Sequence, residues 1–205
     1  MKRSFLIPAA VFLAFSVASC QNHSFPLQEG DLVFQSFASS QTRAIQLATK
    51  SQFTHVGLIL RHDGTLMVYE AVGPVKFTSM DEWIDRDPNR HFVVKRLKNA
   101  KTILTTGNLA KLARVARTFE GKPYDFVFNW SDDKIYCSEL VWKTYDRALG
   151  IEIGGLRKLK DFDLSSAEVR TKLSERYPDG VPLEDTVISP QDVFQSEVLA
   201  TVYTQ

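Results

Sequence analysis

The chain has 205 residues, 44% of them hydrophobic, and its 25 Lys and Arg residues balance 24 Asp and Glu residues to a formal net charge of +1. A near-neutral chain lacks the basic footprint of nucleic-acid-binding proteins and of proteins held on membranes by charge alone. The composition therefore argues against both classes and indicates a globular protein with a substantial core.

The first 19 residues have the pattern of a secretory signal peptide. Lys2 and Arg3 precede an apolar run from Phe5 to Val17, which is the order of the charged and apolar regions in such peptides. The apolar run is too short for a permanent membrane-spanning helix. We therefore exclude residues 1–19 from the fold and expect an exported protein.

Residues 17–20, Val-Ala-Ser-Cys, resemble the lipobox at which bacterial lipoproteins are cut before a cysteine that becomes diacylated. The resemblance implies that the mature protein begins at Cys20 and is anchored to a membrane there, since stable anchoring needs more than one acyl chain. Gln21 differs from the aspartate of the inner-membrane retention signal, which favours the outer membrane in an organism that has one. The alternative is ordinary cleavage near Ala18 or Ser19, which would leave a free thiol.

The mature chain divides into a short tether and one folded unit. Residues 20–29 are polar and contain Pro26, as is typical of a tether. Residues 30–205 suffice for one domain and are too few for two of ordinary size. We expect a single domain and a monomer.

The folded unit begins with a strand and a helix. Residues 31–35 follow a Glu-Gly turn and are rich in β-formers, which predicts a strand. Apolar residues at helical spacing between positions 45 and 48 predict a helix that Ser39 or Ser40 caps.

A β-hairpin follows. Residues 54–60 and 66–72 are apolar and rich in β-formers, and the Asp63-Gly64 dipeptide between them is a strong turn signal. Both faces of the two segments are largely apolar, which predicts central strands that are covered on each side.

The register of that hairpin brings two polar side chains together. A two-residue turn pairs His62 with Thr65, and the same register makes His55 and Glu70 diagonal neighbours on one face. An imidazole and a carboxylate among apolar neighbours need each other or a cleft.

The rest of the chain contains two longer helices, which Gly121 and Gly150 end. The predicted elements are, in chain order, a short helix at 80–84, a strand at 91–97, a helix at 104–119, a loop at 122–136, a helix from Cys137 to Gly150, an amphipathic segment at 166–177, a loop at 178–190 and a strand at 198–202.

Cys137 is the only cysteine besides Cys20, so no disulfide forms within the chain if Cys20 carries lipid. Cys137 stands at a predicted helix N-terminus, where unpaired amides and the helix dipole lower the pKa of a thiol. With His55 as general base and Glu70 to orient the imidazole, the sequence offers the three groups that nucleophilic thiol catalysis requires. The alternative is that Cys137 is an inert, buried small residue.

The sequence does not indicate a metal or cofactor site. No His or Cys cluster shows ligand spacing such as C-x-x-C or H-E-x-x-H. The expected chemistry therefore depends on protein side chains, with no cofactor and no metal.

Four segments carry a resemblance to a known family: Thr54-His55-Val56-Gly57-Leu58, Tyr69-Glu70-Ala71, Gly121-Lys122-Pro123-Tyr124-Asp125 and Tyr136-Cys137-Ser138-Glu139-Leu140-Val141. Together they resemble the YiiX-like, circularly permuted branch of the NlpC-type papain-like hydrolases, in which histidine precedes cysteine. The resemblance implies an α+β, papain-like, circularly permuted core, with an antiparallel sheet packed against helices and the catalytic cysteine at a helix N-terminus.

The resemblance also implies roles for individual residues. Cys137 would be the nucleophile, His55 the base and Glu70 the orienting acid. Tyr124 would line the cleft and hydrogen-bond the substrate or the oxyanion, whereas the alternative for Tyr124 is a packed loop aromatic. For Glu139 we favour a first-turn residue that complements the helix dipole over a second catalytic acid.

These features predict an envelope hydrolase that cleaves an amide, peptide or ester bond through an acyl-enzyme on Cys137. Lipid anchorage and the family resemblance favour cell-wall peptides as substrates. The permuted branch also resembles enzymes that act on acyl lipids and other amides, and the aromatic residues of 122–136 suit an apolar substrate. A non-catalytic envelope binding module on the same fold is the remaining alternative.

Overall fold

The computed structural model describes residues 26–36 and 41–205. The expected signal peptide, the lipidation site Cys20 and most of the tether lie outside the described residues, as do the expected helix caps Ser39 and Ser40. Within the described ranges, no helix combines the length and the apolar character needed to cross a bilayer.

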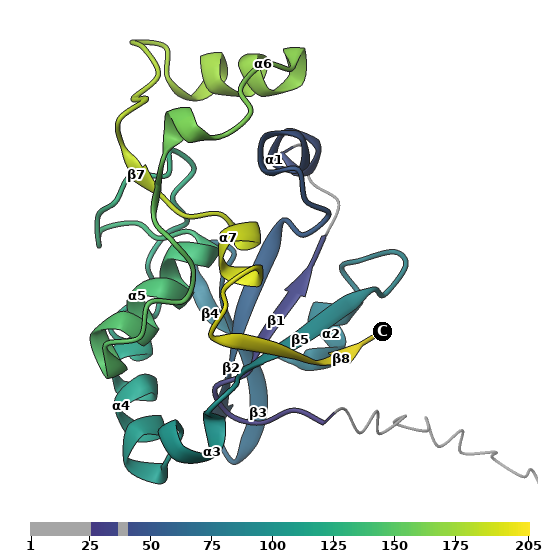
Figure 1. Cartoon of the computed structure of the whole chain (residues 1–205), viewed down its shortest axis with the longest axis vertical. Helices are drawn as coiled ribbons and strands as arrows, with labels where there is room; N and C mark the ends of the chain where they lie inside the picture. Colours follow the sequence, from purple (N-terminus) through teal and green to yellow (C-terminus); the bar gives the residue numbers. More distant parts are fainter. Residues whose placement is uncertain (1–25, 37–40) are drawn as a thin grey trace, which may run out of the picture.

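Six strands form one antiparallel sheet through the middle of the molecule (Figure 1). Their order in space is β4-β3-β2-β1-β5-β8, so both strands of the predicted hairpin lie inside the sheet. The strands are β1 Leu32–Gln35, β2 His55–His62, β3 Thr65–Ala71, β4 Val75–Thr78, β5 Phe92–Leu97 and β8 Leu199–Thr204.

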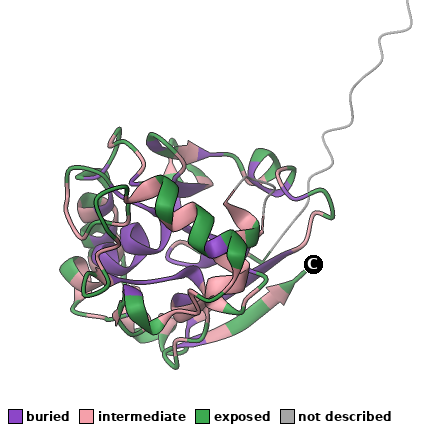
Figure 2. Ribbon diagram, turned by 90° about the horizontal axis from the view of Figure 1, so that it is seen from above, coloured by how far each residue is buried: buried purple, intermediate pink, exposed green. Residues whose placement is uncertain are grey.

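Helices cover both faces of this sheet, since successive strand residues point to opposite sides. Leu58 of β2 joins Leu112 and Leu140 in the larger core, under α4 and α5, whereas Ile59 joins Trp83 of α2 in a second core on the other face. Figure 2 shows the buried residues gathered in the interior between these layers. The helices are α1 Thr42–Thr49, α2 Met80–Ile84, α3 Ala100–Ile103, α4 Thr106–Arg117, α5 Cys137–Leu149, α6 Ala167–Arg176 and α7 Pro190–Phe194.

The hairpin has the register expected from its turn. His62 pairs with Thr65, and the turn residues Asp63 and Gly64 have φ angles of 46° and 81°. Positive φ at both positions is what the tight two-residue hairpin turn requires. The turn therefore fixes which residues of β2 and β3 share a face.

The helix predicted over 104–119 is wrong at its start. The chain leaves helical geometry at Leu104, with φ −85° and ψ 56°, and a new helix, α4, begins after Thr105. The Thr105 side chain accepts a hydrogen bond from the backbone N–H of Asn108 at 3.4 Å. Threonine is a favourable N-cap, so α4 begins at Thr106 and is separate from α3, which lies before the predicted helix and was not predicted.

Several short elements were not predicted. β6, Arg157–Lys158, pairs with β7, Thr186–Val187. β7 lies within the segment 178–190, which was predicted to be a loop. The strand β4 and the helix α7 were also missed, and a single 3-10 turn spans Leu159–Asp161. Elements of two to five residues are too short to show a hydrophobic period.

Candidate active site

Cys137 is the first residue of α5, as predicted, and its side chain is 3% exposed. The preceding residue, Tyr136, has extended backbone geometry, and its N–H donates to the Glu139 carboxylate at 3.4 Å. This contact caps the helix at its start, and Gly150 ends the helix with a φ of 67°. Because α5 packs against β2 and β3, the thiol is held beside the hairpin.

His55 and Glu70 form a buried pair on the hairpin. His55 is the first residue of β2, Glu70 lies near the end of β3, and their side chains are 2% and 0% exposed. His55 Nε2 and Glu70 Oε2 are 2.6 Å apart. Since Glu70 occupies Nε2, Nδ1 is the ring nitrogen left for the hydrogen bond between His55 and Cys137.

Two residues that the sequence reasoning missed satisfy the other oxygen of Glu70. Thr78 Oγ1 and Arg86 Nη1 each donate to Glu70 Oε1 at 2.6 Å. A glutamate in an apolar strand needs hydrogen-bond donors. The sequence therefore indicated that Glu70 has further donors. It could not identify the donors, because Thr78 lies on the unpredicted β4 and Arg86 lies in the loop after α2.

These contacts set the protonation of the pair. Burial raises the pKa of Glu70, whereas the hydrogen bond and charge of His55 lower it. Thr78 and Arg86 lower it further, and the resulting pKa of the Glu70 carboxyl is about 2. Burial lowers the pKa of His55, but the contacts with Cys137 and then with Glu70 raise it to about 9. At neutral pH the carboxylate and the imidazolium are therefore the stable forms.

The pKa of the Cys137 thiol is lowered, whereas that of His55 is raised. Burial raises the pKa of Cys137, whereas the hydrogen bond and positive charge of His55 lower it. Hydrogen bonds with the backbone of Val56 and Ser138 lower it further, so that the pKa of the thiol lies below its usual value. A thiolate beside an imidazolium is the reactive form of a cysteine nucleophile.

Cys137 lines a pocket between α1, α6 and the start of α5, which we call the apolar pocket. Tyr124 also lines this pocket and hydrogen-bonds Cys137. Burial and then the negative charge of Cys137 raise the pKa of the Tyr124 hydroxyl well above its usual value, so the hydroxyl keeps its proton at neutral pH. The pocket wall is otherwise mainly hydrophobic and includes Ala44, Ile45, Phe128, Leu159, Leu173 and Ile188.

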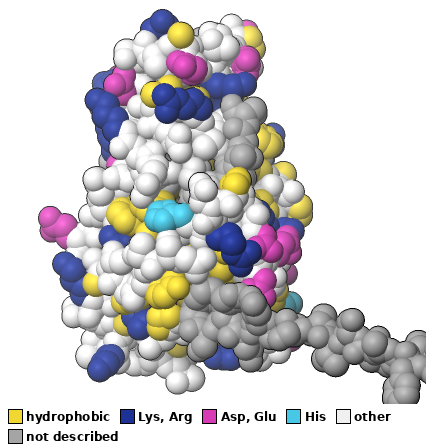
Figure 3. Space-filling view, turned by 90° about the vertical axis from the view of Figure 1, so that its right-hand side faces the viewer, with side chains coloured by type: hydrophobic (Ala, Val, Ile, Leu, Met, Phe, Trp, Pro, Cys, Tyr) yellow, Lys and Arg dark blue, Asp and Glu magenta, His cyan; other side chains and the backbone are white. Residues whose placement is uncertain are grey.

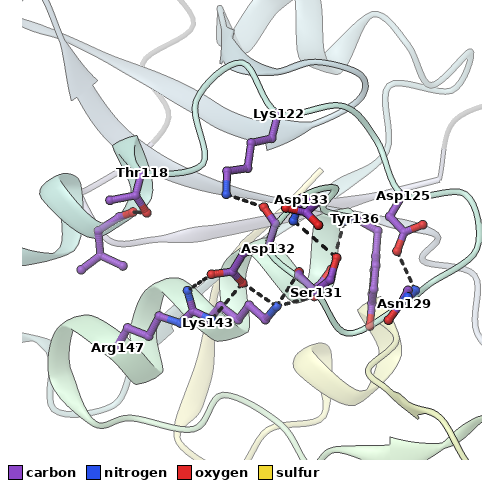
Figure 4. Close-up of polar contacts among 12 residues, drawn as sticks. Thr118, Lys122, Asp125, Asn129, Ser131, Asp132, Asp133, Tyr136, Lys143 and Arg147 are labelled. Carbon is purple, nitrogen blue, oxygen red and sulfur yellow. Dashed lines mark hydrogen bonds and ion pairs between the residues drawn. The ribbon is translucent and has the colours of Figure 1, made fainter.

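Glu139 does not line the apolar pocket and belongs to a separate ionic cluster. Figure 4 shows three other members of this cluster, Asp132, Lys143 and Arg147. The Glu139 carboxylate lies 2.7 Å from Lys143 Nζ, and the same ammonium donates to Asp132 at 2.9 Å. Asp132 also accepts two hydrogen bonds from Arg147, at 2.6 and 2.9 Å. This cluster ties the loop at 122–136 to α5, the helix that carries the nucleophile.

Comparisons with known proteins find one family and two similar proteins named YiiX. Residues 26–203 match the model of a family described as permuted papain-like amidase enzymes, YaeF/YiiX, of the C92 type. The chain is 49% identical over 175 residues to the uncharacterized protein YiiX of Escherichia coli K12, covering 85% of each chain. It also resembles the crystal structure of YiiX from Escherichia coli O157:H7, with a TM-score of 0.83 and 48% identity over 87% of this chain and 97% of that one.

That crystal structure is titled a metalloprotein. In the described part of this chain, no group of three or more His, Cys, Asp or Glu side chains is arranged to hold a metal ion. His55 instead hydrogen-bonds both Glu70 and Cys137. We therefore derive no step through a metal.

The predicted fold class is confirmed. The structure has the expected α+β architecture, an antiparallel sheet packed against helices, and a solved relative shares it. The structure brings together His55, Glu70, Cys137 and Tyr124, with histidine before cysteine in the chain. The chain belongs to the YaeF/YiiX family of permuted papain-like amidases.

Proposed function

We propose that the chain is a cysteine hydrolase in which Cys137 is the nucleophile, His55 the proton carrier and Glu70 the group that orients the imidazole. The observation that carries this proposal is the buried, hydrogen-bonded triad of these side chains beside the apolar pocket. Membership in a family of papain-like amidases supports a hydrolase.

The geometry suits a two-step acyl transfer. The Cys137 thiolate attacks the carbonyl carbon of an amide or ester and forms a C–S bond. The bond to the leaving amine or alcohol then breaks, and that group takes a proton from His55. Water next attacks the thioester, His55 accepts a proton from it, and the thiolate leaves as the acid is released. The backbone N–H of Cys137 and the Tyr124 hydroxyl are the donors we assign to the oxyanion.

Two substrate classes were open from the sequence, which favoured cell-wall peptides over acyl lipids. The lining of the apolar pocket favours the second class, because hydrophobic side chains from α1, α6 and the segment around Ile188 surround the approach to Cys137. A muropeptide is polar along its whole length, and most of its polar groups would lack partners on this mainly hydrophobic wall. We propose an amide or ester with a long apolar group as the substrate.

We also propose that the protein acts as a monomer at the cell envelope, anchored through lipid on Cys20, with the outer membrane as the favoured location. The lipobox-like residues 17–20 support this proposal. Labelled palmitate should enter the wild-type protein and not the Cys20→Ala variant. A mature protein that begins elsewhere than at Cys20 would contradict the anchor.

The activity test compares the mature protein with its Cys137→Ala variant on N-acyl amides and on muropeptides, with products identified by mass spectrometry. Release of fatty acid by the wild type alone supports the proposal. Cleavage of muropeptides alone would contradict the apolar substrate and favour cell-wall peptides.

A non-catalytic binding module is tested by thiol reactivity. If neither substrate is cleaved and iodoacetamide alkylates Cys137 no faster than a free peptide thiol at neutral pH, the thiolate proposal is wrong and the binding module is favoured.

A further inference from the structure

The wall of the apolar pocket is built from helices that are not part of the core. α1 and α6 contact each other, yet α1 has no buried residue and α6 has only Val169. Their apolar side chains, among them Ile45 and Leu173, line the pocket instead. An apolar surface that is left partly open next to a nucleophile suits the apolar part of a ligand.

The apolar wall also contains a half-buried arginine. Arg176, the last residue of α6, lines the same pocket, and its guanidinium lies 4.6 Å from the centre of the Phe128 ring. It donates to the Gln41 side chain at 2.5 Å. Burial lowers the pKa of Arg176, although the nearby Tyr124 hydroxyl opposes this shift. An arginine stays charged in proteins, so the pocket keeps a positive charge.

The structure shows no carboxylate paired directly with this guanidinium in the described ranges, although Asp125 and Glu175 are near enough to interact with it electrostatically. Among the residues that the structure describes, Arg176 forms no ion pair with an aspartate or glutamate within 4.0 Å, in contrast to Arg147 with Asp132. Lys172, one turn earlier on α6, also lines the pocket but pairs with Glu175 at 2.6 Å. A partly desolvated guanidinium with free donors is a receptor for carboxylate or phosphate oxygens.

The cation and the nucleophile share Tyr124 as a neighbour. Tyr124 interacts electrostatically with both Cys137 and Arg176. A ligand that contacts Tyr124 would therefore be influenced by both the nucleophile and the guanidinium. Figure 3 shows lysine, arginine and acidic side chains mixed on the surface at the end of the molecule that carries α6. A mixed surface gives little preference for anions, so the discrimination depends on Arg176 within the pocket.

We propose that the substrate is an anionic amphiphile, in which an apolar chain lies along α1 and α6 and a carboxylate or phosphate near the scissile bond binds Arg176. This inference rests on the proposed hydrolase function and assigns its substrate class. The apolar part supplies most of the burial, and the anionic group selects among apolar amides.

The test uses three probes that share one acyl chain: N-octanoylglycine, its neutral amide N-octanoylglycinamide, and N-octanoylethanolamine phosphate. Mature wild-type protein should hydrolyse at least one anionic probe about tenfold faster, as kcat/KM, than the neutral probe, since charge-assisted hydrogen bonds are the strong ones. Arg176→Gln should remove this preference, so that kcat/KM for the anionic probes falls to about the value for the neutral probe. The two anionic probes distinguish a carboxylate from a phosphate source.

Arg170→Gln is the matched control, because Arg170 lies on the same helix but is exposed and outside the pocket lining. It should keep the wild-type preference. Equal rates on charged and neutral probes in the wild type would overturn the inference, as would an equal loss on all probes in Arg176→Gln.

A binding measurement separates this inference from the proposed chemistry. Calorimetry with Cys137→Ala should show tighter binding of an anionic probe than of the neutral one, and Cys137→Ala/Arg176→Gln should lose that difference. This result would uphold the anion site even if no probe were hydrolysed. Binding without any preference for charge would overturn the site even in an active hydrolase.

Discussion

At the scale of single residues, the proposed chemistry depends on a carboxylate that water does not reach. Glu70 is 0% exposed, and its oxygens are shared among His55, Thr78 and Arg86. With a pKa of about 2, the carboxyl contributes stability that is complete above its usual pKa of 4.5 and is lost as the pH falls toward 2. Its charge keeps the imidazole protonated and fixed in orientation.

The ion pair of Cys137 and His55 predicts an unusual pH profile of alkylation. A free thiol becomes reactive as the pH rises through about 8.5, whereas the alkylation rate of Cys137 should reach its plateau at a lower pH, because His55 lowers the pKa of the thiol. Hydrolysis should fall above pH 9, because the pKa of His55 is about 9 and the leaving group needs that proton. Rates of iodoacetamide labelling and of hydrolysis, measured from pH 4 to 10, check the predicted alkylation plateau and the predicted fall of hydrolysis.

His55→Ala is the corresponding variant. It should slow alkylation at pH 7 by about tenfold or more, because it removes the charge that stabilises the thiolate. An alkylation profile of the wild type that matches that of a peptide thiol would contradict the ion pair.

Arg86 should act on the reaction through Glu70. Arg86→Gln removes a positive charge that lowers the pKa of Glu70, so the carboxyl takes up its proton at a higher pH. We expect the acidic limb of the kcat/KM profile to move up by about half to one pH unit. The matched control is Arg90→Gln, whose guanidinium pairs with Asp85 at the surface. Identical profiles for the two variants would show that Arg86 does not position the triad.

At the scale of elements, α5 connects the nucleophile to the loop that carries Tyr124. The first turn places Cys137 toward the pocket, and the next turns bind the loop through the ionic cluster of Glu139, Lys143 and Asp132. Burial raises the pKa of Glu139, Lys143 lowers it, and the resulting pKa is about 8. The cluster therefore pairs a buried ammonium with a carboxyl that ionises only with difficulty.

Lys143→Met should reveal what this cluster contributes. Removing one partner of a buried pair costs about 3 kcal/mol of unfolding free energy, and Lys143 and Glu139 are 3% and 0% exposed at the side chain. The loss should grow as the pH rises, because the Glu139 carboxyl, without its cation, resists ionisation in the folded state. Urea unfolding at pH 6 and pH 9 measures both effects.

Arg147→Met is the control for this cluster, since its partner Asp132 and its own side chain are 44% and 41% exposed. It should cost less than about 1 kcal/mol. An equally large loss of unfolding free energy in both variants would show that the buried pair contributes no more to stability than the exposed pair. Lys143→Met/Glu139→Gln should recover part of the stability, because the amide needs no counter-charge.

The elements that the sequence predicted correctly are those with local signals. The turn residues Asp63 and Gly64 fixed the hairpin, and with it the pairing of His55 and Glu70; the helical period identified α5 and its first residue, Cys137. The helix break at Thr105 was missed because a capping threonine resembles an ordinary helix residue in a periodic stretch.

Other parts of the site had no local signal at all. β4 has four residues and shows no period, so its Thr78 could not be placed beside Glu70. Arg86 is close to that carboxylate only because α2 packs on the sheet face that holds it. The pocket wall depends on contact between α1 and α6, which are more than a hundred residues apart in the chain, and such contacts follow from tertiary packing.

At the scale of the whole molecule, the sheet separates two tasks. One face holds Glu70 under α2, whereas the other face packs against α4 and α5. Cys137 meets His55 where β2 begins. The apolar pocket lies beyond this junction and is lined by α1 and α6.

This arrangement predicts that substrate binding and thiol activation can be altered separately. Ile45→Ser places a hydroxyl in the pocket wall, and we expect kcat/KM for a long-chain N-acyl amide to fall about tenfold. Alkylation of Cys137 by the small reagent iodoacetamide should stay within about twofold of the wild-type rate. Parallel loss of both activities would show that α1 supports the triad itself.

The order of these parts along the chain has an evolutionary consequence. The three side chains of the triad come from residues 55–137. Much of the pocket wall comes from parts of the chain that follow α5: the 3-10 turn Leu159–Asp161, α6 and the segment around Ile188. Changes in the last third of the gene can therefore exchange the wall without altering the atoms that make and break bonds. Descendants of one ancestral hydrolase can in this way acquire different substrate specificities while they keep the same catalytic residues.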